Sequence, residues 1–448
     1  MTLIDAFLGP IYFILLVVFA YLIRGFFTTK KNRKYFIPAL IIKLIGTTVF
    51  AFIYQFYYGG GDTFNYFNAA KIVMEAFGED FSLGVRIFFL DAGDYTYDTV
   101  KYTYRTPFFR SGEEWFLSRM AVVAGFLSFG SFLASSFLFA FFAFIGTWKL
   151  YQAFLFIYPK LNFEFALAVF AIPSLVFWGS GLMKDTITLG ALGFLTHAVF
   201  SFFIKKDGKV NNILMAFLAV WIISGLKVYI LFTFLPAMLI WVYLKLKGSI
   251  HNPVLKFVSI PILISVIVLF GYFTISNLAA NSVKYNSVES VTNRIGGFHT
   301  DHGSRESGST YSLGTIEYTP IGILKKAPES INITLFRPYL WEVGSPVMLM
   351  TAFESLGFLL VALFILFKSG PLKFVGKFFS NPEVILCIVF TLFLGYVVGF
   401  MSLNFGALAR FKIPLLPYFA MALIIILKGD KSKKPQKKKK KRTIAFAN

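Results

Sequence analysis

The sequence predicts an all-α polytopic membrane protein with about 11 transmembrane helices and two large external loops. Hydrophobic residues make up 57% of the 448 residues, charged residues only 15%, and the mean hydropathy is +0.71. This composition excludes an ordinary soluble domain. Many apolar stretches approach the roughly 20 residues that a helix needs to cross the hydrocarbon core. Every short lysine-rich loop also falls on one side of these stretches, as expected for cytoplasmic loops.

Eleven apolar segments follow one another along the chain, and we expect each to cross the membrane once. They cover residues 6–23, 36–57, 131–148, 166–179, 187–204, 211–225, 229–244, 256–275, 345–367, 383–401 and 412–427. The first has a polar end at Asp5 and no small-residue cleavage site, so we expect a retained helix rather than a signal peptide. A basic cluster between Arg24 and Lys34 follows it and places that loop inside.

The membrane segments form one predicted domain, residues 1–427, with external loops at about 58–118 and 276–344. Residues 428–448 form a polybasic tail that we expect to be cytoplasmic and disordered. Its stretch Lys428 to Arg442 holds ten basic residues and one acid. Such a cluster favours anionic lipid headgroups, at about 1 kcal/mol per charge, over nucleic acid. Frequent Phe, Ile and Lys are typical of an AT-rich bacterial genome, so we expect the bacterial cytoplasmic (inner) membrane.

The lysine-rich loops mark the predicted cytoplasmic side. Several other charged residues lie at the opposite, external ends of the segments. The cations are Lys184, Lys227, Arg337, Arg410 and Lys412, and the neighbouring acids are Asp62, Asp185, Glu342 and Glu354. Ionisable groups at or within a bilayer usually mark a substrate or ion path. We therefore expect an anion-binding site on the external face.

The first external loop opens with three glycines followed by Asp62. Apolar residues between Phe64 and Phe77 recur at helical spacing, which fits an amphipathic helix lying along the membrane surface. Asp62 can be the N-cap of that helix or a general base at the membrane surface, and the two roles are compatible. Most of the later charges of this loop, among which are Glu113 and Glu114, are expected to be solvated.

The connection between the fourth and fifth segments, Pro173 to Thr186, is rich in small residues and joins two short segments. Broken backbone at membrane depth is tolerated only where it is buried in protein or lines a wet cavity. Lys184 and Asp185 can form an ion pair that caps the next helix, or Lys184 can bind a phosphate that Asp185 orients. We favour the second interpretation because Lys227 follows a similar break.

The second external loop contains a glycine- and serine-rich stretch, Arg294 to Ser309, that is typical of a mobile lid. His299, Asp301 and His302 can supply metal ligands, but solvated loop polarity is the favoured interpretation, and no metal site is predicted. A divalent cation stays open as a cofactor. The single cysteine, Cys387, lies in an apolar run and supports neither a disulfide nor a thiolate metal site.

The remaining charges lie in or just before 345–367 and 412–427, the last two predicted segments that enter the membrane from the external side. The planar guanidinium of Arg337 can clamp two phosphate oxygens, and Glu342 lies beside it. Glu354 lies inside a segment, where a carboxylate costs about 2.5–3.5 kcal/mol and must face a partner or a cavity. Pairing with a cation and contact with a substrate are equally favoured. Arg410 and Lys412 begin the final segment, where an anion bridging them also gains from the helix dipole.

These residues resemble the pattern of the GT-C superfamily of polytopic glycosyltransferases, which take sugars from polyprenyl-phosphate carriers at the external face. The resemblance rests on Asp62 in the first external loop, on Phe-Trp-Gly-Ser-Gly-Leu-Met-Lys-Asp at 177–185, and on Ala-Arg-Phe-Lys-Ile-Pro-Leu-Leu-Pro at 409–417. It extends in outline over most of the membrane region. Two features depart from the pattern: the acidic loop follows the second predicted helix instead of the first, and no large soluble C-terminal domain is predicted.

The resemblance implies that Asp62 activates an acceptor hydroxyl and that cations hold the carrier phosphate, from among Lys184, Arg337, Arg410 and Lys412. The partners would be a polyprenyl-phosphate-linked sugar and a glycan or lipid acceptor. Sugar transfer from a lipid phosphate needs a base and cations of this kind. The sequence carries no P-loop or dinucleotide fingerprint, so no nucleotide cofactor is expected.

Three other functions compete with this one. A polysaccharide polymerase or ligase acting on lipid-diphosphate glycans would use the same cations without needing Asp62. A secondary transporter would show inverted repeats and midplane polar residues, for which the sequence offers only Glu354, His197 and Glu164 and no clear repeat. A structural subunit leaves the external cations unexplained.

Overall fold

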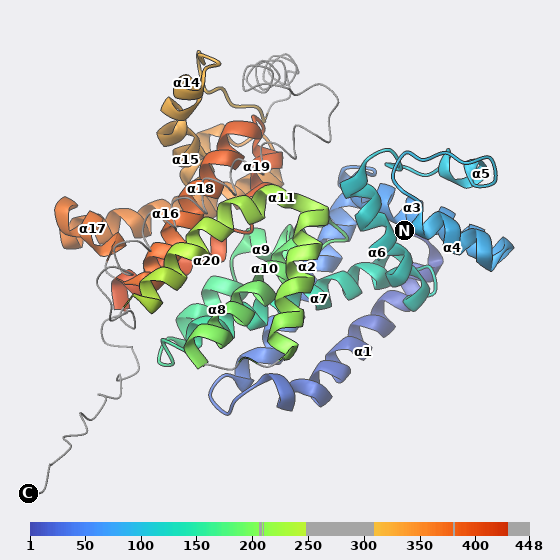
Figure 1. Ribbon diagram of the computed structural model, residues 1–448, viewed down its shortest axis with the longest axis horizontal. Helices are drawn as coiled ribbons and strands as arrows, with labels where there is room; N and C mark the ends of the chain where they lie inside the picture. The colour runs from blue at the N-terminus through green and yellow to red at the C-terminus, as the bar shows by residue number, and fades with distance from the viewer. Residues whose placement is uncertain (206–207, 209, 248–308, 380, 429–448) are drawn as a thin grey trace, which may run out of the picture.

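A computed structural model describes residues 1–205, 208, 210–247, 309–379 and 381–428 of the chain (Figure 1). The predicted segment 256–275, the His299, Asp301 and His302 cluster and the tail beyond Lys428 lie outside these residues. Helices dominate the described chain, which contains no named strand and one isolated β-bridge, between Thr310 and Asn404. The all-α prediction is confirmed for these residues.

The described helices follow one another in the order α1 (Leu3–Phe27), α2 (Arg33–Phe52), η1 (Ile53–Tyr57), α3 (Asp62–Glu79), α4 (Phe81–Phe89), α5 (Val100–Thr103), α6 (Gly112–Leu127), α7 (Phe132–Leu155), α8 (Asn162–Phe170), α9 (Pro173–Phe177), α10 (Lys184–Phe200), η2 (Ser201–Lys205), α11 (Val210–Leu246), α14 (Pro320–Lys325), α15 (Ala327–Phe336), η3 (Leu340–Glu342), α16 (Pro346–Ser369), α17 (Pro371–Phe378), α18 (Pro382–Met401), α19 (Phe405–Phe411) and α20 (Leu416–Lys428). Of these, η1 and η2 are π-helical and η3 is a 3₁₀ turn.

Seven of the described helical runs are long and apolar enough to cross a membrane: α1, α2 with η1, α7, α10 with η2, α11, α16 and α18. The bent pair α19 and α20, which meet at 67°, brings the number to eight if it is one span. These lengths and compositions are those of a multi-pass membrane protein. The predicted number of 11 is not reached in the described part of the chain, in part because three predicted segments take another form.

The predicted sixth and seventh segments are joined in the single element α11, which is broken at Lys227 by non-helical backbone angles (φ −154°, ψ 72°). Lys227 pairs with Asp185 at the start of α10, whereas Trp241 stacks on Phe200 at the other end of α10. The two halves of α11 therefore run in opposite directions beside α10, and they meet at an apex in Figure 1. The two predicted segments, 211–225 and 229–244, therefore correspond to the two halves of α11.

The predicted fourth segment is two short helices, α8 and α9, of nine and five residues. Pro173 is the first residue of α9, where its fixed φ and missing N–H suit a helix start but prevent a continuous helix from α8. Glu164 in α8 pairs with Lys428 at 2.8 Å, while Trp178, just after α9, contacts the ring of Tyr54. The broken pair therefore carries the chain from one end of the helix bundle to the other.

The lysine-rich loops gather at one end of the bundle. Lys245 pairs with Glu383 at the start of α18, and the indole of Trp148 donates a hydrogen bond to the carbonyl oxygen of Phe27, 2.8 Å away, at the end of α1. The charged residues of the predicted site lie at the opposite end. This separation is what the predicted alternation of loops requires, and the assignment of the lysine-rich end to the cytoplasm stays a prediction.

Helices α7 and α10 pack in direct backbone contact, and most of their residues are buried. A Cβ atom built on Gly146 would lie 2.1 Å from the carbonyl oxygen of Gly190, and one on Gly193 would lie 2.1 Å from that of Gly146. Small residues permit such close approach between membrane helices. The contact holds α10, which begins with Lys184 and Asp185, firmly against α7.

The first predicted loop is largely helical and contains α3 to α5 and the start of α6, which continues to Leu127. Gly59, Gly60 and Gly61 all have positive φ (67°, 148° and 123°), a region that glycine enters at little cost, and they turn the chain from η1 into α3. The predicted helix is present as α3, but its buried face packs on α4 and α6. Packing within the protein therefore explains its apolar spacing, in place of the predicted membrane surface.

Candidate functional site

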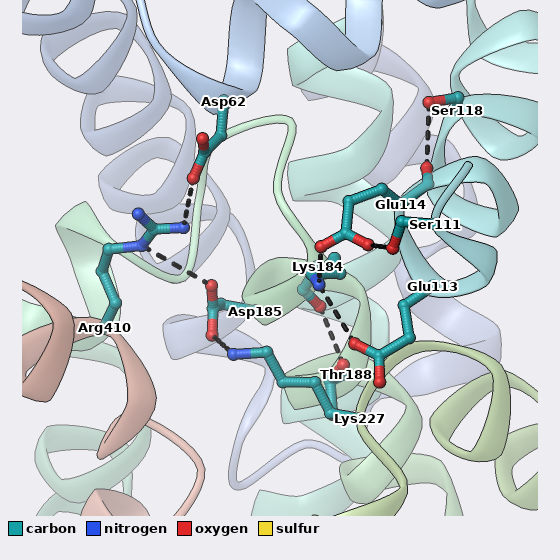
Figure 2. A network of polar contacts seen from close by, with 10 residues as sticks. All are labelled: Asp62, Ser111, Glu113, Glu114, Ser118, Lys184, Asp185, Thr188, Lys227 and Arg410. Atoms are coloured by element: carbon teal, nitrogen blue, oxygen red, sulfur yellow. Dashed lines mark hydrogen bonds and ion pairs between the residues drawn. The ribbon is translucent and has the colours of Figure 1, made fainter. Parts of the chain in front are cut away.

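A cavity of about 490 Å³ lies at the end of the bundle opposite the lysine-rich loops, between α3, α6, α10, α11, α18 and α19. Its charged lining residues are Asp62, Glu113, Glu114, Lys184, Asp185, Lys227 and Arg410, and the rest of its wall is Tyr66, Tyr229, Val397, Val398, Met401, Ser402 and Phe411. Five of the nine residues predicted for the site meet here, and Figure 2 shows them with their neighbours.

Asp62 lies at the mouth of the cavity, with 42% of its side chain exposed. It is the first residue of α3, and the N-cap position belongs to Gly61, so the interpretation of Asp62 as the N-cap is wrong by one residue. A carboxylate in the first turn is nevertheless favoured by the helix dipole. The Nη2 of Arg410 donates a hydrogen bond to Asp62 Oδ2 at 3.1 Å, which joins residues 348 positions apart in the sequence.

Asp185 links two cations in the buried part of the cavity. It forms an ion pair with Lys227, and its other oxygen lies 3.9 Å from the Nε of Arg410. The side chains of Asp185 and Lys227 are 2% and 4% exposed. Lys227 occupies the break in α11, so the kink delivers its ammonium to the start of α10. Asp62, Arg410, Asp185 and Lys227 therefore form a chain of alternating charge (Figure 2).

Lys184 is held by two adjacent carboxylates from α6. Its Nζ lies 2.6 Å from Glu114 Oε1 and 3.1 Å from Glu113 Oε2. The hydroxyl of Ser111 donates to the second oxygen of Glu114. The expectation that Glu113 and Glu114 are solvated loop charges is therefore wrong for Glu114, which is 21% exposed, and holds only in part for Glu113, which is 52% exposed.

Sequence reasoning missed nine lining residues, among them Glu113, Glu114, Tyr66 and Tyr229, and weak signals existed for the first three of these four. Ser111 and Glu114 have the spacing of a capping box, which marks the start of α6 and hence a fixed position for the acids. Tyr66 lies one helical turn after Asp62 and so on the same face of α3. Burial, with the nearby Asp62 and Glu114 carboxylates, raises the pKa of the Tyr66 phenol. Tyr229 follows the kink in α11 and gave no signal.

The cavity does not carry the surplus of cations that the sequence suggested. With all groups ionised, four carboxylates and three cations leave a formal charge of −1. Each cation has a carboxylate oxygen within 4 Å. A phosphate can therefore bind here only by taking the place of a carboxylate, and the exposed Glu113 is the one held least firmly.

Glu354 and Lys412 lie outside this cavity and are buried together. Glu354 Oε1 is 4.0 Å from Lys412 Nζ, and Glu354 Oε2 accepts a hydrogen bond from the backbone N–H of Ser174 at 2.8 Å. Lys412 also donates to Ser355 at 3.1 Å. The pair ties α16 to α9 and to the turn after α19. Of the two interpretations of Glu354, pairing with a cation is the one that these contacts favour.

Arg337 and Glu342 form a third, separate group. The Nε of Arg337 lies 3.0 and 3.1 Å from the two carboxylate oxygens of Glu342, and Glu342 Oε2 also accepts a hydrogen bond from the N–H of Tyr339. Although desolvation opposes it, these hydrogen bonds hold the pKa of Glu342 below its ordinary value. The planar guanidinium thus engages a carboxylate of its own loop, and neither residue lines the cavity.

Metal ligands are sparse in the described ranges. Within residues 1–205, 208, 210–247, 309–379 and 381–428, no group of three or more His, Cys, Asp and Glu side chains is arranged to hold a metal ion. Cys387 is a buried free thiol in α18.

Comparison with known proteins gives no relative for this chain: no protein-family model, no curated protein and no solved structure matches it. The chemistry of the cavity must therefore carry any functional assignment.

Proposed function

We propose that the protein is an integral-membrane glycosyltransferase that transfers a sugar from a polyprenyl-phosphate carrier to an acceptor at the external face of the membrane. The single observation that carries the proposal is the cavity itself, where an accessible carboxylate and three cations meet. The fold would be GT-C-like with 11 crossings. The protein would lie in the bacterial inner membrane, with a cytoplasmic C-terminal tail bound to anionic lipids.

The reaction needs a base for the acceptor hydroxyl and, a short distance away, cations for the departing phosphate. Asp62 takes the proton of an acceptor hydroxyl, whose oxygen attacks the anomeric carbon. The bond between that carbon and the phosphate oxygen breaks, and its electron pair leaves with the phosphate. Arg410 and Lys184 then stabilise the departing charge. The carrier phosphate would displace Glu113 from Lys184, while Arg410 keeps Asp62 in place.

A large apolar groove beside the cavity supports a lipid substrate. It has a volume of about 820 Å³ and is lined by α4, α6, α7, α10 and α11. Phe116 in the groove lies one turn along α6 from Glu113 in the cavity, and Ile187 lies one turn along α10 from Lys184. A lipid with its phosphate at Lys184 can therefore lay its chain along the same two helices, where apolar burial is favourable.

Among the cavity carboxylates, Asp62 is the best candidate for the base. Asp185 is buried, and each of its two oxygens faces a cation, Lys227 or Arg410. Glu114 is bound by both Lys184 and Ser111. Glu113 is exposed and is the one competing base. A polymerase or ligase acting on lipid diphosphates would use the same cations, and it differs by not requiring Asp62.

Mass spectrometry of glycans and lipid-linked sugars tests the proposal. The native strain is compared with a deletion strain and with deletions complemented by Asp62→Asn, Glu113→Gln or Asp94→Asn at matched protein level. Asp94 is an exposed loop acid that serves as the control. We expect the sugar to be missing and the polyprenyl-phosphate donor to accumulate in the deletion and with Asp62→Asn, whereas Asp94→Asn restores the native profile.

Other outcomes discriminate clearly. Loss of the sugar with Glu113→Gln and its return with Asp62→Asn would move the base to Glu113. A sugar that is lost on deletion and restored by both variants would favour the polymerase or ligase. An unchanged profile in the deletion strain would reject all transferase functions.

A further inference from the structure

A second pocket, of about 250 Å³, lies next to the charged cavity. Tyr57 and Tyr58 line it from the end of η1, Trp178 from the end of α9, and Thr351 from α16. The short helix α19 serves both sites, because Arg410 and Phe411 face the cavity while Phe405, Gly406 and Ala409 face the pocket. The Arg410 guanidinium also lies 6.0 Å from the centre of the Trp178 ring. Arg410 therefore lies between the two sites: it lines the cavity and contacts Trp178, which lines the pocket.

The pocket differs from the cavity in charge. Among the residues that the structure describes, its lining includes no Asp, Glu, Lys, Arg or His, whereas seven charged side chains line the cavity. An anion or cation in this pocket would lose its hydration without gaining a partner of opposite charge. The composition therefore selects an uncharged ligand.

Two buried polar groups of the pocket have no hydrogen-bond partner among the described residues: the indole N–H of Trp178 and the hydroxyl of Thr351. These residues are 4% and 1% exposed. Buried polar groups in proteins are nearly always paired. The indole is a donor only and the hydroxyl is both donor and acceptor, so a ligand hydroxyl group that came within hydrogen-bond distance would satisfy either one.

The aromatic side chains add a second recognition element. Tyr57 and Tyr58 remain 57% and 47% exposed although they are large aromatic residues. Aromatic side chains combine a broad apolar face with a polar edge. A ligand that has both an apolar C–H face and several hydroxyls complements this wall.

We propose that this pocket binds a neutral saccharide ring. Binding itself depends only on the pocket, whereas the identification of that saccharide as the acceptor rests on the proposed transferase function. In that role the ring sits beside the Asp62–Arg410 pair, and the lipid-phosphate donor occupies the charged cavity. The acceptor is then a glycan and not a bare lipid hydroxyl.

Ligand-observed saturation-transfer NMR on the purified full-length protein in nanodiscs tests this assignment. The probes are methyl glycosides of neutral hexoses and of N-acetylhexosamines, with a hexose 6-phosphate as the charged comparison. Thr351→Val removes one hydroxyl with little change in shape. Thr391→Val is the matched control, because Thr391 in α18 is also buried with an unpartnered hydroxyl but does not line the pocket.

We expect saturation transfer to at least one neutral glycoside with the native protein and with Thr391→Val. Thr351→Val should weaken this binding at least threefold, and Trp178→Phe should weaken it as well. The proposal is overturned if no neutral glycoside binds, if Thr351→Val binds as Thr391→Val does, or if only the hexose phosphate binds. Saccharide binding in a protein whose Asp62→Asn variant still transfers sugar would keep the pocket and reject Asp62 as base.

Discussion

At the scale of single residues, Asp185 occupies the position on which the charge chain depends, since it lies between Arg410 and Lys227. Removing one partner of a buried ion pair costs about 3–5 kcal/mol because a charge is left uncompensated. Asp185→Asn leaves Lys227 without its carboxylate and Arg410 with Asp62 alone, whereas Lys227→Met leaves Asp185 facing Arg410. We therefore expect Asp185→Asn to lower the thermal unfolding midpoint of the purified protein further than Lys227→Met does.

The control for this prediction is Lys101→Met, which breaks an exposed pair with Glu79 and should change the midpoint little. A midpoint for Lys227→Met at or below that of Asp185→Asn would contradict the central place of Asp185.

How far the site could be predicted depended on where each charge lies in the sequence. The sequence indicated Lys184, Lys227 and Arg410 because a cation at the external end of an apolar segment usually marks a substrate or ion path. Arg337 and Lys412 gave the same signal. In the structure, however, Arg337 pairs with Glu342 of its own loop, and Lys412 pairs with the buried Glu354. Sequence position alone does not separate a cation held by a structural partner from one that faces a cavity.

At the scale of helices, the contact between α7 and α10 determines where the start of α10 lies. Gly146→Ala places a methyl group on the carbonyl of Gly190, an atom that cannot move without shifting α10. Overpacking of this kind costs about 1–3 kcal/mol. We expect Gly146→Ala to lower the thermal unfolding midpoint and to reduce the sugar-transfer product, because Lys184 and Asp185 move with α10.

Gly357→Ala in α16 is the matched control, since no atom lies within 4 Å of its added methyl group. Alanine is also the better helix former, by about 1 kcal/mol. Equal midpoints for the two variants would mean that the helices α7 and α10 separate freely.

Apolar length predicted most of the long helices, and it failed where backbone breaks occur inside apolar sequence. The predicted segment 131–148 corresponds to α7 and 383–401 to α18. The break between α8 and α9 was not located, because the sequence on both sides is apolar and only Pro173 marks it. In α11, by contrast, the sequence marks the break, because Ser224 and Gly225 lie just before Lys227, and the ion pair of Lys227 with Asp185 holds the broken backbone there.

At the scale of the whole molecule, the segregation of lysines predicts which end faces the cytoplasm. Asp94 lies between η1 and α7, and Lys160 lies beyond α7, at the lysine-rich end; both side chains are exposed. In intact cells, a membrane-impermeant maleimide should label the Asp94→Cys variant directly. It should label Lys160→Cys only after the membrane that holds the protein is opened.

The native protein supplies the control, because Cys387 is fully buried and should not react in either preparation. Labelling of Lys160→Cys in intact cells, with Asp94→Cys protected, would invert the predicted orientation.

The joining of Asp62 to Arg410 also has a consequence for biosynthesis. Lys184, Asp185 and Lys227 enter the membrane well before α19 is made, and domains form as the chain emerges. Asp62 gains its cation only when residue 410 has been inserted. Chains released by the ribosome before α19 is made therefore lack the pair at the mouth of the cavity, and the proposed transfer has to wait for α19.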